Sequence, residues 1–454
     1  MTHARPDSLG VLDRFPMTHS DQTIARFLAA AFVAGPLVAD EMATRGARML
    51  GRRWRWLTRL ALRVSEEFQH GPRPRRATVE EFLLGDSVFH KACERHELEI
   101  ADYSITAQMC PVDAARNWPV PPLCTFADTA DWLNVRSREL EWFADLRGLA
   151  ARASHQKLRH YHYRILSKRF GQVRLIEAPK LRLKEIQRQI LREILDAIPA
   201  HEAAHGFCTG RSTKTFAARH VAKSVVLRMD LRDFFPSISR AQVQSVFRTV
   251  GYPESVANVL AGLCTNCAPD DIWDGVAVPV QQLRSVIARY ARPHLPQGAP
   301  TSPALANLCA YRIDCRLSGL AASVGATYTR YADDLAFSGG DEFRRSAKRF
   351  SLHASAIVID EGFDVNHRKT RIMQSGACQR LAGVVVNAHT NVPRKDYDHL
   401  KAILVNCLRS GPQSQNRDQH ADFRAHLNGR VAYVELINPE RGKKLRELFR
   451  RIDW

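Results

Sequence analysis

Apolar residues recur at two different periods along the chain, and the change of period divides it into three parts. Helical spacing dominates residues 1–150, which we expect to form a helical extension. Short runs of β-type composition appear between residues 151 and 390, and helical spacing returns from 391 to 454. The pattern therefore predicts an α+β protein with boundaries near residues 150 and 390.

Individual elements can be placed within these parts. Residues 161–166 and 173–176 predict a β-hairpin that turns near Phe170-Gly171. A helix is expected next, because apolar residues then share one helical face: Leu183, Ile186, Ile190, Ile194 and Ala197. Near the C-terminus, Phe423, Leu427, Val431 and Val434 predict a helix that breaks at Asn438-Pro439, before a basic final helix.

Two adjacent acids, Asp333 and Asp334, lie between the β-type runs 327–330 and 335–338, which predicts a strand, a tight turn and a strand. Like charges at a hairpin tip repel each other unless a cation binds between them, and the alternative is a solvated acidic turn. Asp230 follows another apolar β run, at residues 224–229. Three such carboxylates suffice to hold two divalent ions about 3.5–4 Å apart, so we expect two Mg²⁺ ions, with Mn²⁺ as a substitute.

A loop rich in Gly and Pro, residues 295–300, leads into a predicted helix between these acids. Thr301 and Ser302 are candidate N-caps, and Pro303 suits the first helical turn. The loop alone is also consistent with an ordinary junction between a loop and a helix. The order of Asp230, this loop and the Asp pair, however, resembles the palm of reverse transcriptases.

Further motifs extend the resemblance over roughly residues 130–454, and within the family it is strongest to bacterial retron reverse transcriptases. The supporting segments are His205-Gly206-Phe207 with Gly210-Arg211-Ser212, 230–238, 297–303, 361–370 and 380–387. Two retron signatures depart from the family pattern. Asn-Ala-x-x-His is represented by Phe216-Ala217-Ala218-Arg219-His220, and Val-Thr-Gly by Leu381-Ala382-Gly383.

The resemblance implies a right-hand polymerase, with fingers and palm in residues 151–390, a helical thumb in 391–454 and an added N-terminal extension. It implies an RNA-directed DNA polymerase that uses dNTPs to copy a structured noncoding RNA. The DNA product would stay linked to RNA through priming from a 2′-OH, in an antiphage defence system with an effector protein.

Site residues follow from the motifs. Asp230, Asp333 and Asp334 would be the metal ligands, which carboxylate chemistry and the resemblance both support. Phe235 matches the family's steric gate against a ribose 2′-OH, or is a core aromatic residue. Gln297 matches the residue that contacts the nucleotide sugar, and Lys369 is a candidate for the triphosphate. Arg174 is either a second triphosphate contact or a surface charge of the hairpin, and His220 either meets RNA or is structural.

Composition indicates the kind of partner and the cellular compartment. The 454 residues carry a formal net charge of +19, which favours a polyphosphate partner. The ten Cys residues show no paired framework and no signal peptide is apparent, so we expect a reducing cytoplasm. Cys264-Thr-Asn-Cys267 lacks a second pair for zinc. The apolar run 27–39 is interrupted by Gly35-Pro36 and is expected to form a buried helix rather than a membrane span.

The N-terminal extension contains seven Arg and no acid between Arg45 and Arg63. Six of them recur at helical spacing and would form one continuous cationic stripe suited to RNA phosphates: Arg45, Arg48, Arg52, Arg55, Arg59 and Arg63. Arg48, Arg52, Arg55 and Arg59 are the candidate RNA contacts. A solvated face and a membrane-surface helix are the alternatives, and Gly46 and Gly51 weaken the helix prediction itself.

Three other functions remain open from the sequence. One is a defence-associated reverse transcriptase of another lineage, either protein-primed or untemplated. A group II intron-like enzyme is the second, although the stretch after Asp334 has room for a thumb but not for a further maturase region. The third is an inactive RNA-binding scaffold, against which the intact Asp230, Asp333 and Asp334 argue.

Overall fold

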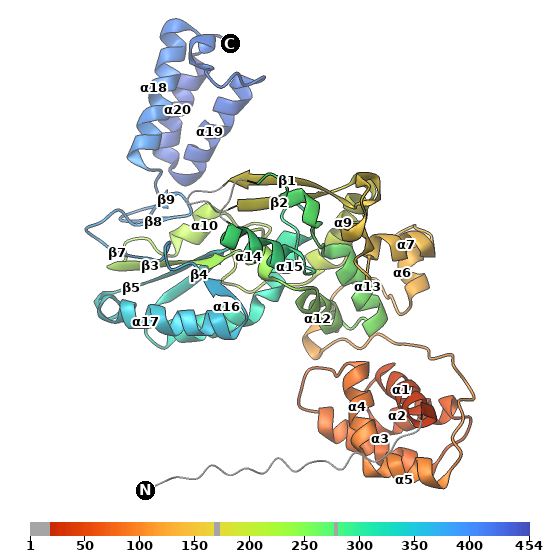
Figure 1. Cartoon of the computed structure of the whole chain (residues 1–454). Helices are drawn as coiled ribbons and strands as arrows, with labels where there is room; N and C mark the ends of the chain where they lie inside the picture. Colours follow the sequence, from red (N-terminus) through yellow and green to blue (C-terminus); the bar gives the residue numbers. More distant parts are fainter. Residues whose placement is uncertain (1–18, 168–172, 277–279) are drawn as a thin grey trace. The chain divides into compact units, whose positions relative to one another are not determined.

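The computed structural model describes residues 19–167, 173–276 and 280–454, and it divides the chain into two compact units (Figure 1). We call the first the helical unit: the chain up to Leu146 together with Gln244–Gly262. The second, the sheet unit, comprises Arg147–Val243 and Leu263–Trp454. No helix among the described residues is both long and apolar enough to cross a membrane.

The helical unit begins with a bundle around one apolar core. Its helices are α1 (His19–Val33), α2 (Ala39–Met49), α3 (Arg55–Phe68), α4 (Arg76–Gly85) and α5 (Ser87–Arg95). Leu28, Phe32, Met42 and Leu57 are fully buried in this core. Gly46 lies where an added Cβ would come within 2.9 Å of Leu28, so α1 and α2 pack closely there. The apolar run from Phe27 is therefore helical up to Val33 and faces the core, as predicted.

The predicted continuous arginine stripe is wrong. α2 ends at Met49 and α3 starts at Arg55, so the arginines lie on two helices and the turn between them. Gly51 adopts a φ of 68° in that turn, a conformation that favours glycine. Once the helix ends, residues spaced by three or four no longer share a face.

Two short helices, α6 (Phe126–Trp132) and α7 (Ser137–Ala144), complete the first segment of the helical unit. Thr125 and Asp128 form a reciprocal capping box at the start of α6. α12 (Arg240–Val250) and α13 (Glu254–Cys264) lie at the two ends of the later segment.

The sheet unit opens with α8 (Leu149–Arg152) and the predicted hairpin. Strand β1 (Tyr161–Ser167) pairs antiparallel with β2 (Val173–Pro179), with Tyr161 opposite Pro179. The expected turn at Phe170-Gly171 lies outside the described residues. α9 (Leu181–Glu193) follows, and it buries Leu183, Ile186 and Ile190 as predicted.

The central sheet has the strand order β4-β5-β3-β6, and β7 also pairs with β3. Its strands are β3 (Val225–Arg232), β4 (Thr327–Tyr331), β5 (Asp334–Gly339), β6 (Asp364–Val365) and β7 (Arg371–Gln374). The strand, turn and strand predicted around the acid pair are confirmed by β4 and β5. β3 continues two residues beyond Asp230, so this acid lies within the strand rather than at its end.

Helices surround this sheet. α16 (Tyr311–Ala322) packs on β4, and α17 (Asp341–Asp360) packs on β3 and β5 (Figure 1). Phe337 on β5 contacts Phe350 of α17 edge-on, with ring centroids 4.9 Å apart. The remaining helices of this part are α10 (Thr213–Ala218), α11 (Phe234–Ser237), α14 (Val280–Tyr290) and α15 (Ser302–Cys309).

The C-terminal part consists of a small hairpin and three helices. β8 (Arg380–Leu381) pairs with β9 (Val384–Val385), and α18 (Arg394–Ser410), α19 (Phe423–Ile437) and α20 (Pro439–Arg450) follow. Leu404, Leu427, Val431 and Leu445 are buried among them. The break at Asn438-Pro439 is confirmed, and the Asn438 side chain caps α20 by accepting from the Arg441 amide at 3.1 Å.

Candidate active site

Strand pairing brings the three predicted acids together. Asp230 on β3 lies directly opposite Asp334 on β5 in the antiparallel register. Asp333 occupies the turn before β5, and its carbonyl accepts from the Leu231 amide at 2.8 Å. Ala332, the other turn residue, has a φ of 54°, in the left-handed region. The pairing of two strands thus brings together acids that lie over 100 residues apart in the sequence.

The acids lie in surroundings that disfavour three negative charges. Burial, followed by the charges of Asp230 and Asp334, raises the pKa of Asp333 to about 6. Burial also raises the pKa of Asp334, although the neighbouring Arg228 opposes the rise. Asp230 is 2% exposed, and its Oδ1 is buried with no hydrogen-bond partner among the described residues. An orphaned carboxylate oxygen beside two further acids is a donor set that suits a divalent cation.

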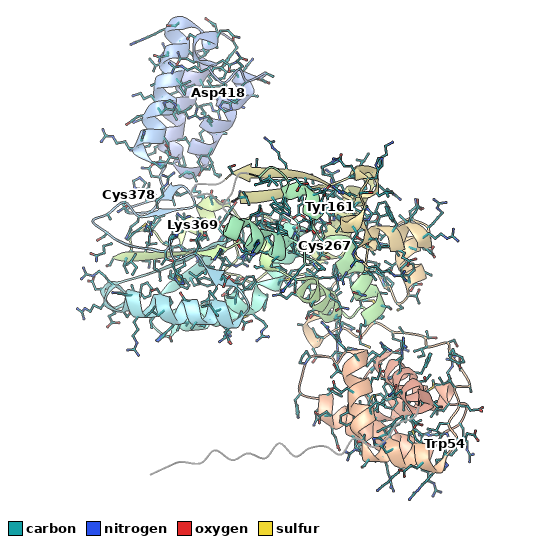
Figure 2. All side chains as sticks on the ribbon, viewed as in Figure 1. Trp54, Tyr161, Cys267, Lys369, Cys378 and Asp418 are labelled. Atoms are coloured by element: carbon teal, nitrogen blue, oxygen red, sulfur yellow. The ribbon has the colours of Figure 1, made fainter. Side chains whose placement is uncertain are left out.

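Two basic side chains of the protein contact these acids. The Lys369 Nζ donates to Asp230 Oδ2 at 2.8 Å, and Lys369 itself is about half exposed (Figure 2). Arg228 donates to Asp334 Oδ1 through Nε at 2.9 Å and through Nη2 at 2.6 Å. Within the described residues no three His, Cys, Asp or Glu side chains are already arranged as a metal site. The cations of Lys369 and Arg228 thus neutralise part of the acidic charge in this conformation.

A cavity of about 590 Å³ and another of about 720 Å³ lie in the sheet unit, and two of the three predicted acids line the larger one. Asp230 and Asp333 line it together with all four predicted nucleotide contacts: Arg174, Phe235, Gln297 and Lys369. Sequence reasoning missed the other basic residues of this cavity, Arg228, Arg232, Arg368 and Arg371. Period-2 alternation could have found Arg228, because it lies two residues before Asp230 and on the same face of β3.

The loop carrying Gln297 is held against the β1–β2 hairpin. The Gln297 carbonyl accepts from the Glu177 amide at 2.8 Å. Gly298 has a φ of 133°, and an added Cβ would lie 2.9 Å from the Glu177 carbonyl oxygen. Pro303 lies in the first turn of α15 as predicted, and Thr301, one of the two N-cap candidates, is the N-cap residue, although its side chain makes no capping hydrogen bond.

Phe235 is only partly buried, so its ring reaches the cavity. It lies on the short helix α11, beside Phe234 at 5.7 Å and Phe207 at 6.1 Å between ring centroids. Asp233, which precedes α11, forms an ion pair with Arg289 of α14. The ring thus has aromatic neighbours and also lines the cavity that Asp230 and Asp333 line.

His220 does not lie where RNA could reach it. Its side chain is fully buried, its Nδ1 is 2.7 Å from the Ser338 hydroxyl, and its Nε2 is 2.7 Å from the Thr329 hydroxyl. Burial, followed by the positive charges of His205, Lys223 and Arg219, lowers the pKa of His220 to about 3. The prediction of an RNA contact is corrected here: His220 is a neutral structural residue that joins β4 and β5.

Comparisons with known proteins agree with this geometry. Residues 166–403 match the reverse transcriptase (RNA-dependent DNA polymerase) family. The retron Mx65 reverse transcriptase of Myxococcus xanthus is 42% identical over 66% of this chain and 66% of its own length. The retron Ec86 reverse transcriptase of Escherichia coli is 32% identical over 60% of this chain and 74% of its own length. The chain belongs to the retron reverse transcriptase family.

Two further similarities complete the comparison. The retron Mx162 reverse transcriptase of Myxococcus xanthus is 34% identical, and the alignment spans 68% of this chain and 63% of that protein. The match thus covers about two thirds of the length of both Myxococcus relatives. An apo telomerase structure from Candida tropicalis aligns with 51% of this chain and 55% of that chain, at 12% identity and a TM-score of 0.31. That score supports no structural conclusion.

The four arginines predicted to bind RNA lie in the helical unit and have different surroundings. Arg48 pairs with Asp102 at 3.0 Å, and the Arg52 guanidinium lies 4.5 Å from the ring centre of Trp54 (Figure 2). Arg55 and Arg59 are exposed on α3. Arg45, which has the same spacing, instead donates to the carbonyls of Ala31, Phe32 and Pro36. Arg45 therefore supports the bundle and does not extend the basic surface.

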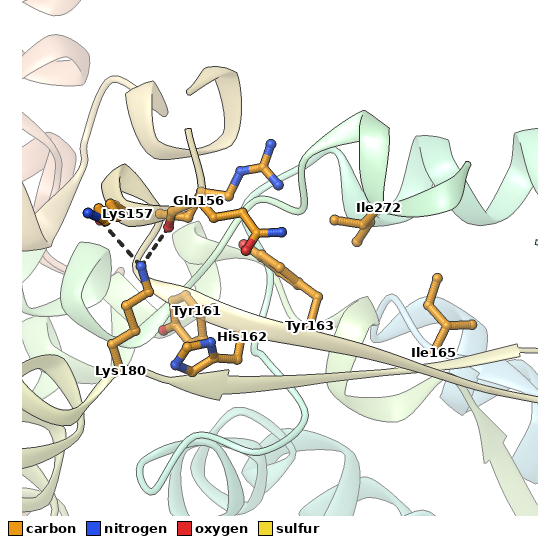
Figure 3. Close-up of a pocket in the computed structure, with 9 residues that line it drawn as sticks. Gln156, Lys157, Tyr161, His162, Tyr163, Ile165, Lys180 and Ile272 are labelled. Carbon is orange, nitrogen blue, oxygen red and sulfur yellow. Dashed lines mark hydrogen bonds between the residues drawn. The ribbon is translucent and has the colours of Figure 1, made fainter. Parts of the chain in front are cut away.

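The cavity of about 590 Å³ lies at the base of the β1–β2 hairpin (Figure 3). Lys180 donates through Nζ to the carbonyls of Gln156 at 2.6 Å and Lys157 at 3.3 Å. Tyr163 and Ile165 supply an apolar wall. None of its described lining residues is an acid, so this cavity lacks ligands for the metal chemistry of the other one.

Proposed function

We propose that this protein is an RNA-directed DNA polymerase of retron type. One observation carries the proposal: β3–β5 pairing brings Asp230 opposite Asp334 and next to Asp333, and Asp230 and Asp333 line one cavity with the four predicted nucleotide contacts. Family membership supports the same assignment. The central sheet would be the palm, the β1–β2 hairpin with α9 the fingers, and α18–α20 the thumb of a right-hand polymerase. The proposed domains are 1–150, 151–390 and 391–454.

Each cavity residue then has a role. Asp230, Asp333 and Asp334 would hold two Mg²⁺ ions, which in this chemistry activate an attacking hydroxyl and stabilise the leaving pyrophosphate. The Phe235 ring would exclude a ribose 2′-OH, and Gln297 would contact the sugar. Lys369 and Arg174 would meet the triphosphate, where fixed cations stabilise developing negative charge. Lys369 must leave Asp230 to do so, and its half-exposed side chain has room to move.

The template in this proposal is a structured noncoding RNA. The net charge of +19 supports a polyphosphate partner, and the relatives named as retron reverse transcriptases support the RNA class. Synthesis would start from an internal 2′-OH of the folded RNA, which the protein holds beside the acids. We further propose that the RNA–DNA product acts with an effector protein in antiphage defence.

Primer extension with the purified full chain tests the polymerase proposal. A DNA primer annealed to a generic RNA template should be extended with dNTPs in the presence of Mg²⁺ or Mn²⁺. A folded protein that binds this duplex but extends no primer under any metal condition would overturn the proposal. Extension with ribonucleotides at equal efficiency would contradict the DNA-polymerase assignment alone.

The priming chemistry has a separate test. DNA recovered with the protein from cells carrying the native locus should remain linked to RNA after protease treatment. A debranching enzyme should release it, because a 2′–5′ linkage is the bond that such an enzyme cleaves. A DNA 5′ end found on a Tyr or Ser of the chain, or free, would reject 2′-OH priming and leave the polymerase assignment standing.

One observation favours a binding protein that kept the fold. Lys369 pairs with Asp230 and Arg228 pairs with Asp334, so cations of the protein itself neutralise part of the acidic charge. In such a scaffold, Asp230→Asn would change the stability of the protein but would abolish no metal-dependent activity. Metal-dependent extension by the wild-type chain that disappears in Asp230→Asn would exclude the scaffold.

A further inference from the structure

Asp230 and Asp334 lie on paired strands, whereas Asp333 lies in a turn whose backbone accepts a hydrogen bond from a buried side chain. Ala332 adopts a left-handed conformation that a non-glycine residue maintains only where its surroundings hold it. The Ala332 carbonyl accepts from Arg330 Nη1 at 3.2 Å. Arg330 is the largest of the fully buried side chains and is 0% exposed.

Arg330 is held by a network rather than by one partner. Its Nε donates to Asp314 Oδ1 at 2.8 Å and its Nη2 to Asp314 Oδ2 at 2.6 Å, in a bidentate pair with a side chain that is also 0% exposed. Tyr328 donates to the same Asp314 at 2.8 Å. Nη1 also donates to Asn307 Oδ1 at 3.0 Å. The planar guanidinium is therefore fixed in position and orientation before it reaches the turn.

The same network also holds the far side of the turn. Asn307 donates through Nδ2 to the Gly206 carbonyl at 2.8 Å. Gly206 packs so closely that an added Cβ would lie 2.7 Å from the Ala332 amide nitrogen. The backbone of Arg330 closes the arrangement, because its carbonyl accepts from the His205 amide at 2.7 Å. Ala332 is thus confined between the segment at Gly206 and the guanidinium of Arg330.

A buried ion pair is weak evidence for stability, since an apolar replacement of similar volume often stabilises a protein as well. Specific geometry is a better reason for the charged pair here. Only a fork of several N–H groups can bind Asp314, Asn307 and the Ala332 carbonyl at the same time. A lysine ammonium could neutralise Asp314 but could not reach all three acceptors.

We propose that Arg330 is a positioning residue of the active site, which Asp314 and Asn307 orient so that it holds the Ala332 turn and aims Asp333 at the metals. This inference rests on the proposed polymerase function. Asp314 and Asn307 lie on α16 and α15, so these two helices would contribute to the reacting centre through Arg330.

Arg330→Lys tests the proposal in the full chain, with Phe337→Leu as a control. Phe337 is a buried residue of β5 that stacks on Tyr328, so its truncation loosens the same sheet without touching the turn. Three quantities are measured: kcat and KM for dNTP in primer extension, the Mn²⁺ dissociation constant by electron paramagnetic resonance, and the melting temperature. Tyr328→Phe removes one bond to Asp314 and leaves the turn contacts in place.

Arg330→Lys should lower kcat on the order of 10²-fold, since a misplacement of about 1 Å has that effect on reacting groups, while KM for dNTP stays nearly constant. Mn²⁺ should bind about tenfold more weakly, whereas Tyr328→Phe and Phe337→Leu should retain wild-type Mn²⁺ affinity. The proposal fails if Arg330→Lys and Phe337→Leu show the same kcat and the same Mn²⁺ affinity.

A second variant tests the same proposal if Arg330→Lys does not fold. Asn307→Ser shortens the side chain and removes its amide, so Arg330 loses one of its acceptors and the Gly206 carbonyl loses its Nδ2 donor, while the ion pair with Asp314 stays. It should lower kcat by about tenfold, and wild-type kcat would overturn the proposal. If the wild-type chain extends no primer, the proposed function fails on its own. Hydrogen exchange of the peptide spanning 328–336 still decides the inference, because exchange must be faster in Asn307→Ser than in Phe337→Leu.

Discussion

In the sheet unit, acids that are far apart in sequence meet at one point, whereas in the helical unit, arginines that are close in sequence have separate partners. Asp230 and Asp334 lie opposite each other on paired strands. Arg45 and Arg48, only three residues apart, bind backbone carbonyls of α1 and the carboxylate of Asp102, respectively. Regular spacing alone therefore says little about which charges act together.

The difference follows from how strands and helices align residues that are distant in the sequence. Antiparallel strands align residues wherever they pair, so one hairpin and one partner strand suffice to align distant acids. Helical register persists only while the helix continues. α2 ends at Met49, and Gly51 turns the chain before α3 begins at Arg55. The arginine pattern is interrupted at that point.

The largest effect is expected from removing one of the acids that meet in the sheet unit, which tests whether these acids act together. Asp333→Asn should abolish DNA synthesis, with a fall in rate of at least about 10³-fold, because a proposed metal ligand is removed. RNA affinity should change by no more than a few-fold. Steady-state extension rates and a binding titration measure both, and Asp341→Asn, at an exposed position in the first turn of α17, is the control. Synthesis at the wild-type rate in Asp333→Asn would rule out the assigned site.

Phe235 tests whether the cavity above the acids selects its substrate. Phe235→Val should admit ribonucleotides about 10²-fold better relative to dNTPs, because the collision with the 2′-OH is removed. Phe207 lines the same cavity and contacts the Phe235 ring, so Phe207→Val is a matched control. Relative kcat/KM for dNTP and rNTP is the measurement. Unchanged discrimination in a folded Phe235→Val protein would make Phe235 an ordinary core aromatic residue.

His220 is buried in the sheet unit and should make the stability of the protein depend on pH. Its pKa is lowered from 6.5 to about 3, so the unfolded chain takes up a proton between these values while the folded chain does not. The stability is full above pH 6.5 and falls as the pH decreases through this window, by about 1.4 kcal/mol per pH unit. Between pH 7.5 and 5, His220→Gln should therefore lose about 2 kcal/mol less stability than the wild type.

Denaturant titrations at both pH values measure this difference. His162 is exposed on β1, so His162→Gln should keep the wild-type pH dependence. Equal pH dependence in His220→Gln and the wild type would mean that the imidazole accepts a proton without unfolding, contrary to its buried position.

The smallest expected effect concerns the helical unit. Replacing Arg48, Arg52, Arg55 and Arg59 by Gln should flatten the salt dependence of RNA affinity. For single-stranded RNA, each phosphate that the protein no longer neutralises removes about 0.7 from the slope of log affinity against log salt. Arg48 and Arg52 already contact Asp102 and Trp54, so we expect most of the change from Arg55 and Arg59. Filter-binding assays over a range of salt concentrations provide the slopes.

Arg45→Met is the contrasting variant. It should lower the melting temperature of the helical unit and leave the salt slope unchanged, because Arg45 donates to the carbonyls of Ala31, Phe32 and Pro36. An identical slope in the fourfold variant and the wild type would assign the remaining arginines to a solvated face.

Much of the sheet unit could be predicted from the sequence because its signals are local. Apolar runs ending in polar turns predicted β3, the β4–β5 hairpin and the β1–β2 hairpin, and helical spacing predicted α9, α19 and α20. Asp230, Asp333, Phe235, Gln297 and Lys369 were found from their motifs and Arg174 from the need for a cation at the triphosphate, and all six line one cavity. The prediction of one arginine stripe was wrong because a short break between α2 and α3 does not alter the spacing of the arginines in the sequence. The break does change the direction in which the following residues face.

Local order along the chain was thus determined by the sequence itself: which segments extend, which turn, and in which order the acids occur. The partners of the charged side chains were decided only by tertiary structure. Burial of Arg330 against Asp314, of His220 between Ser338 and Thr329, and the contacts of Lys369 and Arg228 with acids join residues from separate elements. Periodicity describes one segment at a time, whereas a buried charge is satisfied by whatever the fold places beside it.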